Sequence, residues 1–192
     1  RRRDHLYVYT PGEDKPEQLP PGDFDASDPA WSPDGQHIAF VSDRSASPDS
    51  YYGRNVWTVA VNDKNHPLTK ISADEGTARS PAWSPDSQSI TYVRSVGPDV
   101  GGSALTPTRR LEVAALAEGT VRVLTENLDR NVSDPRFDAA GKRINFLLQD
   151  EGKIHLASIG VDGSNIRRNI DGDLTVDDHA EAGGVRAVLA GD

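Results

Sequence analysis

Two arginines are the best candidates for binding chemistry in this sequence, Arg79 and Arg130. A guanidinium group holds a carboxylate through two parallel hydrogen bonds, so either residue could bind the C-terminal carboxylate of a peptide. The alternative is a structural ion pair with an aspartate of a neighbouring repeat, such as Asp28 or Asp134. We therefore treat both arginines as candidate substrate-binding residues.

Two adjacent tyrosines, Tyr51 and Tyr52, form a second candidate site. They lie in a long polar connection between two expected strands. Tyrosine is enriched at protein interfaces, so the pair is a candidate interface. The alternative is that both rings pack over the edges of the expected sheets.

Nothing in the sequence provides a catalytic nucleophile. Ser103 follows Gly101, but Leu105 stands where a Gly-x-Ser-x-Gly nucleophile elbow requires its second glycine. The chain has no cysteine, which excludes a thiolate nucleophile and a Cys-ligated zinc. Its five histidines are scattered without ligand spacing, and the acidic stretch 171–178 lacks the pattern of a calcium loop. We expect no catalytic residue, no metal site and no cofactor here.

The charge of the chain limits its partners. The 192 residues carry a formal net charge of -9, which repels nucleic acid phosphates. No apolar run approaches the roughly 18 residues needed to span a membrane. We expect neither nucleic acid nor membrane as a partner. The expected location is the cytoplasm, with a periplasmic or secreted location left open.

One sequence unit recurs three times and must position these residues. Two copies read Asp-Pro-Ala-Trp-Ser-Pro-Asp-Gly from Asp28 and Ser-Pro-Ala-Trp-Ser-Pro-Asp-Ser from Ser80, and a diverged copy starts at Asp134. The aromatic anchors of the copies are spaced 52 and 54 residues apart: Trp31, Trp83 and Phe137. Units of about 40–50 residues are typical of propeller blades with four strands each.

Each unit can be divided into four strands. In the first unit we expect strands over 29–32, 37–41, 55–61 and 67–71. The second of these is apolar on both faces, as a strand sandwiched between blades requires. The expected fold is an all-β, incomplete β-propeller of about four blades, each a four-stranded antiparallel sheet. Its expected divisions are a half blade over 1–22, blades over 23–72, 73–126 and 127–171, and a half blade over 172–192.

The repeat, followed by Ile-Ala-Phe-Val-Ser-Asp-Arg from Ile38, resembles the propeller repeats of two families. One is the TolB-like periplasmic proteins, and the other is the prolyl-oligopeptidase family of serine peptidases. The stretch from Leu124 to Ser133, followed by Phe-Leu-Leu-Gln-Asp-Glu-Gly from Phe146, looks more like the acylaminoacyl peptidases of the second family. The long insertion between Arg94 and Arg109 also fits a peptidase propeller better than a TolB propeller.

The peptidase resemblance implies a non-catalytic role for this chain. In that family the propeller caps an α/β-hydrolase domain that carries the catalytic triad, and it restricts access to short peptides. The implied partners are a short or N-acylated peptide substrate and an α/β-hydrolase domain of the same parent chain. The alternative is a TolB-like propeller that binds protein partners without catalysis. A third class, propeller enzymes with a metal in the channel, is disfavoured because no ligand set recurs.

The expected half blades at the two ends of the chain suggest how copies of it would associate. The sequence holds no methionine, and we interpret it as a piece of a longer protein. The expected half blades would leave strand edges and an apolar face uncovered at both ends. A closed propeller protects these surfaces by completing its ring. We therefore expect a homo-oligomer that forms through the open propeller edges.

Overall fold

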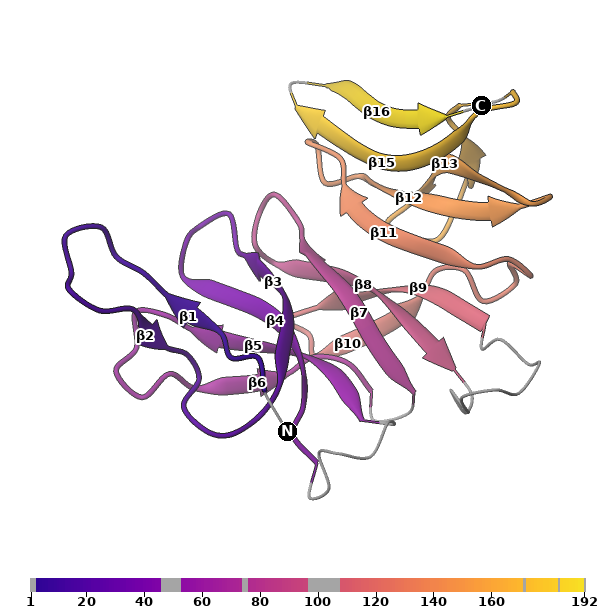
Figure 1. Ribbon diagram of the computed structural model, residues 1–192. Helices are drawn as coiled ribbons and strands as arrows, with labels where there is room; N and C mark the ends of the chain where they lie inside the picture. The colour runs from indigo at the N-terminus through magenta and orange to yellow at the C-terminus, as the bar shows by residue number, and fades with distance from the viewer. Residues whose placement is uncertain are drawn as a thin grey trace.

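The computed structural model describes residues 3–45, 53–73, 76–96, 108–170, 172–182 and 184–191. Within these ranges 16 β-strands form five antiparallel sheets, three with four strands and two with two strands. Figure 1 shows the sheets following one another along an open arc, with the first and last strand pairs at opposite ends. The predicted fold class, an incomplete all-β propeller, is confirmed.

The strands follow chain order within each sheet. The N-terminal pair contains β1 (Tyr7–Val8) and β2 (Glu17–Gln18). The first blade contains β3 (Ala26–Trp31), β4 (His37–Asp43), β5 (Arg54–Ala60) and β6 (Leu68–Lys70). The second blade contains β7 (Thr77–Trp83), β8 (Ser89–Val96), β9 (Thr108–Ala115) and β10 (Thr120–Val123). The third blade contains β11 (Val132–Phe137), β12 (Arg143–Asp150), β13 (Lys153–Gly160) and β14 (Arg167–Arg168), and the C-terminal pair contains β15 (Thr175–Ala182) and β16 (Val185–Gly191).

Contacts between neighbouring sheets centre on the first strand of each sheet. Strand β7 lies against β3, β4 and β5, while β11 lies against β7, β8 and β9. We therefore call the first strands of the blades the inner strands and the fourth strands the outer strands. This wedge-like packing is the arrangement of propeller blades around a central channel.

The core is divided into layers between successive sheets. Strand β4 shows why, because Ile38 and Phe40 pack toward the N-terminal pair, whereas Ala39 and Val41 pack toward the second blade. All four side chains are buried. Similar apolar layers lie on both sides of the third blade. The expectation that the second strand is apolar on both faces is confirmed.

The first strand of each blade is longer than its proline suggests. We expected the first of these strands to begin at Pro29, but β3 begins at Ala26. The residues before the prolines, Asp28, Ser80 and Asp134, have φ values of 51°, 52° and 46°. The strand register shifts at each of these points, as in a β-bulge. A bulge accommodates a residue without a backbone N–H, so the proline lies inside the strand.

The repeated Ser-Pro-Asp turns have a structural role. In the first turn the Ser32 hydroxyl donates to Asp34 Oδ1 at 2.6 Å, and the backbone N–H of Gln36 donates to the same oxygen at 3.0 Å. These two hydrogen bonds lower the pKa of the Asp34 carboxyl below its usual value. The second turn repeats the arrangement with Ser84 and Asp86. The turns therefore fix the hairpins between the first and second strands.

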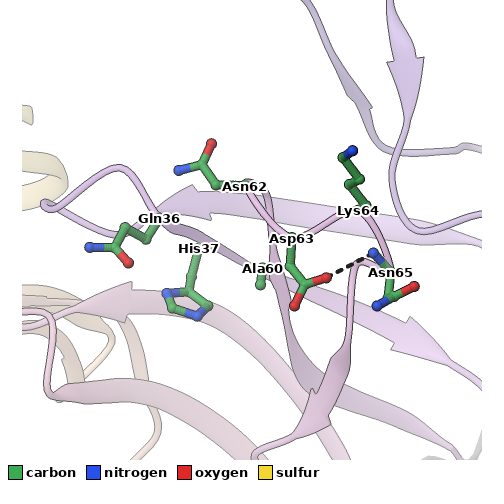
Figure 2. A pocket seen from close by; sticks show the side chains of 7 residues that line it. All are labelled: Gln36, His37, Ala60, Asn62, Asp63, Lys64 and Asn65. Carbon is green, nitrogen blue, oxygen red and sulfur yellow. Dashed lines mark hydrogen bonds between the residues drawn. The ribbon is translucent and has the colours of Figure 1, made fainter.

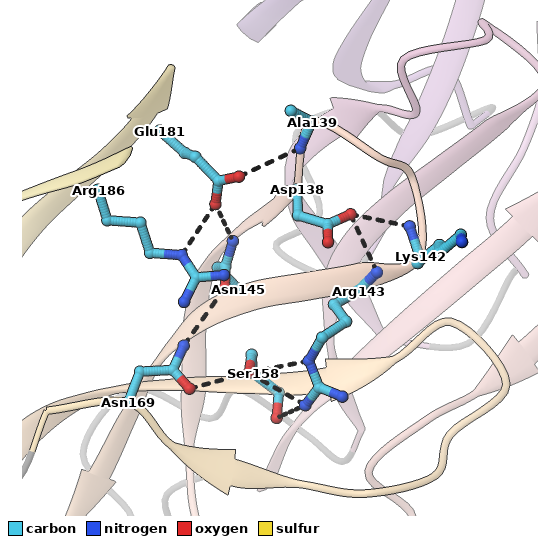
Figure 3. A network of polar contacts seen from close by, with 9 residues as sticks. All are labelled: Asp138, Ala139, Lys142, Arg143, Asn145, Ser158, Asn169, Glu181 and Arg186. Atoms are coloured by element: carbon cyan, nitrogen blue, oxygen red, sulfur yellow. Dashed lines mark hydrogen bonds and ion pairs between the residues drawn. The ribbon is translucent and has the colours of Figure 1, made fainter. Parts of the chain in front are cut away.

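A polar network joins the third blade to the C-terminal pair (Figure 3). The Glu181 carboxylate of β15 accepts hydrogen bonds from Asn145 Nδ2 at 3.1 Å and from Arg186 Nε at 2.8 Å. Within the third blade, Arg143 donates to the Ser158 hydroxyl, which in turn donates to Asn169 Oδ1. The network orients β15 and β16 as the start of a further blade.

Candidate functional site

The predicted arginines lie where the first strand of a blade begins. Arg79 is the third residue of β7 and stands opposite Val93. Its Nε atom is buried and has no hydrogen-bond partner among the described residues. Arg130 lies two residues before β11, and its side chain is 48% exposed. A ligand can therefore reach Arg130 directly, whereas the Nε of Arg79 is closed off.

Arg130 belongs to an ion-pair group within its own blade. Its Nε donates to Asp150 Oδ1 at 2.5 Å, and its NH1 donates to the carbonyl oxygen of Asp129 at 2.6 Å. Arg168 of the outer strand β14 bonds the other oxygen of Asp150. Asp150 is therefore shared by two guanidinium groups. This partner differs from the neighbouring-repeat aspartates that we considered from the sequence.

The structure does not join the two candidate arginines, Arg79 and Arg130, to each other. Among the described residues, no hydrogen bond or ion pair joins Arg79 to Arg130, Asp150 or Arg168. Tyr51 and Tyr52 lie outside the described residues. Substrate contact by Arg79 and Arg130, and the interface role of the tyrosines, remain predictions.

A buried charged group in the second blade was missed at the sequence level. Glu112 of β9 is fully buried, and Arg94 of β8 donates from Nε to its Oε1 at 2.6 Å. Tyr92 stands directly opposite Glu112, and its hydroxyl is also buried. Burial, together with the Glu112 charge, raises the pKa of Tyr92 well above its usual value. The tyrosine therefore stays neutral, and the ion pair anchors this end of the blade.

Buried polar atoms without partners gather at this same end of the first two blades. Most of these atoms lie where β4 and β8 finish and where β7 and β9 begin, and those of Tyr92 and Glu112 lie near the middle of their strands. The atoms belong to these residues: Asp43, Arg44, Arg79, Tyr92, Ser95, Arg110 and Glu112. Buried polar groups normally find partners, so such a concentration marks a polar site. We call this region the polar end of the blades.

Arg44 shows how a cation is held at the polar end. Its guanidinium carbon lies 4.5 Å from the centre of the Phe24 ring and 6.0 Å from that of Phe40. Burial lowers the pKa of Arg44. Stacking on aromatic rings stabilises a guanidinium that has few hydrogen bonds. The polar end thus combines positively charged planar groups with aromatic surfaces.

A second charged group that we did not predict from the sequence lies on the inner strands β11 and β15. Arg136 NH2 of β11 lies 3.0 Å from Asp134 Oδ2 and 3.0 Å from Asp178 Oδ1 of β15. His179 Nε2 lies 2.9 Å from the carbonyl oxygen of Asp134. Arg136 occupies the repeat position that is alanine in the other two copies. An arginine in place of this alanine was the feature of the sequence that could have indicated the ion-pair group.

Two hollows lie at the other end of the first blade. Figure 2 shows one of about 540 Å³, lined by Gln36, His37, Ala60 and residues 62–65. A groove of about 440 Å³ runs between the first and second blades, past His37, Lys70 and Trp83. None of the unpartnered buried atoms at described positions belongs to the residues that line either hollow. The polar end is therefore the better candidate site.

The described residues offer no metal centre. No group of three or more His, Asp and Glu side chains in these ranges is arranged to hold an ion. The structure also contains no helix, in the ranges given above, that is long and apolar enough to cross a membrane.

Several known proteins are similar to this chain. The peptidase YuxL of Bacillus subtilis, which is uncharacterized, is 32% identical over 76 residues, covering 40% of this chain and 10% of YuxL. A puromycin-hydrolyzing peptidase of Mycobacterium tuberculosis matches 97% of this chain with a TM-score of 0.75 and 19% identity. A TolB protein of Agrobacterium tumefaciens matches 90% of this chain with a TM-score of 0.68 and 19% identity. No family model matches the sequence.

The chain spans only part of each of these proteins. It covers 32% of the mycobacterial peptidase and 57% of the TolB protein. These likenesses agree with both families that the repeat resembles. The chain therefore has the fold of the propeller domains that occur in prolyl-oligopeptidase-type peptidases and in TolB proteins.

Proposed function

We propose that this chain is the propeller portion of a serine peptidase that hydrolyses short or N-acylated peptides. It admits and positions the substrate, while a Ser-His-Asp triad on an α/β-hydrolase domain, outside these 192 residues, performs the reaction. The observation that carries the proposal is the 32% identity with the peptidase YuxL. The fold-level match to puromycin-hydrolyzing peptidases over 97% of the chain supports it.

The Arg130 group of the third blade supplies chemistry that suits this role. Peptides of the proposed kind carry a C-terminal carboxylate, and Arg130 is half exposed with N–H groups to spare. Asp150 holds its Nε, which fixes the orientation of the guanidinium plane. A pre-oriented guanidinium loses little side-chain entropy when it binds a carboxylate. Arg79 is more buried than Arg130, so Arg130 is the residue that we test first.

The experiment uses the full-length gene product and a pair of substrates. Arg130→Ala is expected to raise KM for a short N-acetylated peptide with a free carboxylate more than it lowers kcat. The same peptide with a C-terminal amide is expected to show little change between variant and wild type. Arg122→Ala, on the exposed outer strand β10, is the matched control. Equal effects of Arg122→Ala and Arg130→Ala, or a loss confined to kcat, would contradict the proposal.

A TolB-like binding module is the second candidate. The observation that favours it is the fold match to a TolB protein over 90% of this chain, with a TM-score of 0.68. Reading the gene beyond codon 192 separates the two. A downstream Gly-x-Ser-x-Gly motif within an α/β pattern supports the peptidase. An open reading frame that continues only with further propeller repeats supports the binding module.

The cytoplasm is the location that we propose for the parent protein. Cell fractionation with an antibody against this chain tests the proposal. Recovery with the periplasmic fraction would favour the TolB-like alternative.

A further inference from the structure

The second and third blades meet away from both ends of the chain (Figure 1). The apolar layer between them includes Val93 and Leu111 of the second blade and Val132 of the third. Directly opposed residues of an antiparallel sheet place their side chains on the same face. Arg79 stands opposite Val93, so its side chain lies on the face of the second blade that packs against the third blade. A charged side chain therefore borders this apolar layer.

The same face of the second blade carries a second arginine. Arg109 precedes Leu111 by two residues in β9, and side chains at this spacing in a strand point to the same face. Ser95 stands opposite Arg109, is 2% exposed and has a buried hydroxyl without a hydrogen-bond partner. Within the described residues, neither Arg79 nor Arg109 makes a side-chain hydrogen bond or ion pair. Because buried polar groups normally find partners, this face has bonding capacity left for a ligand.

The third blade adds two further arginines at the same place. Asn131 Oδ1 accepts a hydrogen bond from the backbone N–H of Arg109 at 3.0 Å, which holds the start of β9 beside the residue that follows Arg130. Arg130 and Arg168 share the carboxylate of Asp150. Their side chains are 48% and 37% exposed, so a ligand can reach both. We call this group of four arginines the basic junction: Arg79, Arg109, Arg130 and Arg168.

Positive charge exceeds negative charge at the basic junction. Within the described residues, only two carboxylates pair with its four guanidinium groups, those of Asp150 and Asp129. The side chain of Asp129 is fully exposed, so water screens its charge, whereas that of Asp150 is 11% exposed. The neighbouring Lys153 has its own partner in Asp173. This local excess favours an anionic ligand, even though the chain as a whole carries a net charge of -9.

We propose that the basic junction holds the C-terminal residue of the peptide substrate and selects an acidic one, aspartate or glutamate. This inference rests on the proposed function, because it names the peptides that the parent enzyme prefers. Arg130 binds the α-carboxylate, and Arg109 binds the side-chain carboxylate. A guanidinium group can hold each carboxylate through two hydrogen bonds. The two carboxylates together neutralise the excess charge of the junction.

The other two arginines support this arrangement. Arg168 bonds one oxygen of Asp150, so it helps to hold the carboxylate that orients Arg130. The Nε of Arg79 is buried, so Arg79 contributes mainly its positive charge. Arg109 has no side-chain partner at any described position, which leaves its guanidinium group able to turn toward the ligand.

The test uses the full-length gene product and two substrates that differ in one charge. These are N-acetyl-Ala-Ala-Asp and N-acetyl-Ala-Ala-Asn, in which an amide replaces the side-chain carboxylate. We expect kcat/KM to be about tenfold higher for the aspartate peptide, the effect of one charge-assisted hydrogen bond at a half-exposed site. Arg109→Met should reduce this ratio to about one, whereas Arg130→Ala should lower kcat/KM for both peptides. Arg122→Met, on the exposed outer strand β10, is the matched control and should keep the ratio.

Failure of this inference and failure of the proposed function give different results. Equal kcat/KM for the two peptides in the wild type, or a ratio that survives Arg109→Met, would overturn the inference, while hydrolysis of both peptides would still support a peptidase. A full-length product that hydrolyses neither peptide would contradict the proposed function. Binding measurements then test the basic junction by itself.

Calorimetric titration, after inactivation with a serine-directed probe, reports on binding without catalysis. We expect the aspartate peptide to bind about tenfold more tightly than the asparagine peptide, and this difference to disappear in Arg109→Met. Arg109→Lys keeps the charge but not the planar fork, so it should retain part of the difference. Inorganic phosphate is the probe for unselective anion binding. Phosphate that binds at least as tightly as the aspartate peptide, or equal binding of the two peptides, would overturn the inference.

Discussion

The buried ion pair of the second blade should be a major source of stability. Arg94→Met keeps much of the side-chain volume but leaves the fully buried Glu112 carboxylate without this partner. Removing one member of a buried pair costs about 3–5 kcal/mol. Because the Arg94 side chain is 15% exposed, some water screens the charge, and we expect the lower end, about 3 kcal/mol. For a chain of this size that corresponds to about 6–12 °C in Tm.

The assay is urea unfolding followed by tryptophan fluorescence at neutral pH. The double variant Arg94→Met/Glu112→Gln removes both charges, so its stability should return to within about 1 kcal/mol of wild type. Arg122→Met, on the exposed outer strand β10, is the control and should change little. If the single variant lost less than about 1 kcal/mol, or if the double variant were as unstable as the single one, the pair would not anchor the blade.

Three further substitutions, Tyr92→Phe, Trp83→Phe and Gly35→Ala, test separate features of the fold. In the wild type, the free energy of unfolding should fall as pH rises above about 10, because Tyr92 ionises in the unfolded chain while its raised pKa keeps it neutral in the folded chain. In Tyr92→Phe this fall should be smaller when urea midpoints are compared between pH 8 and 11. Trp83→Phe should cost about 1–3 kcal/mol in urea unfolding, because the Ala30 carbonyl loses its donor, although Phe137 shows that the ring fits this repeat position. Gly35→Ala should lower the free energy of unfolding by about 1–2 kcal/mol, measured by thermal unfolding, because alanine is strained at the φ of 70° found there. The space around Gly35 is open, so no steric clash adds to this cost. A loss below 0.5 kcal/mol for Trp83→Phe, or no loss for Gly35→Ala, would count against these roles.

The repeat made most of the fold predictable. Three copies with aromatic anchors at similar spacing indicate blades, and the strand β4 is apolar on both faces as sandwiching requires. The bulges before the prolines were not predicted. We placed each strand start at the proline, because proline lacks a backbone N–H. In the structure the residue before each proline, Asp28, Ser80 or Asp134, has a positive φ and forms a bulge, so the strand begins earlier and continues past the proline.

The charged groups were less predictable than the fold, because their contacts depend on strand register. Arg94 and Glu112 are separated by the long connection between β8 and β9, so their spacing in the sequence does not show that they meet. Register places Tyr92 opposite Glu112, and Arg94 then reaches the carboxylate diagonally. Arg130 was identified as a candidate, but its partner, Asp150, is in its own blade. Opposite charges alone do not select between such partners.

Labelling with a serine-directed probe tests the central claim most directly. The full-length gene product is incubated with a fluorophosphonate, digested and mapped by mass spectrometry, alongside hydrolysis of an acyl-amino-acid chromogenic substrate. We predict hydrolysis with the label on a serine outside residues 1–192, and neither activity nor label in this chain alone. A labelled serine within the chain, Ser103 included, or a full-length product that neither reacts nor hydrolyses the substrate, would contradict the account.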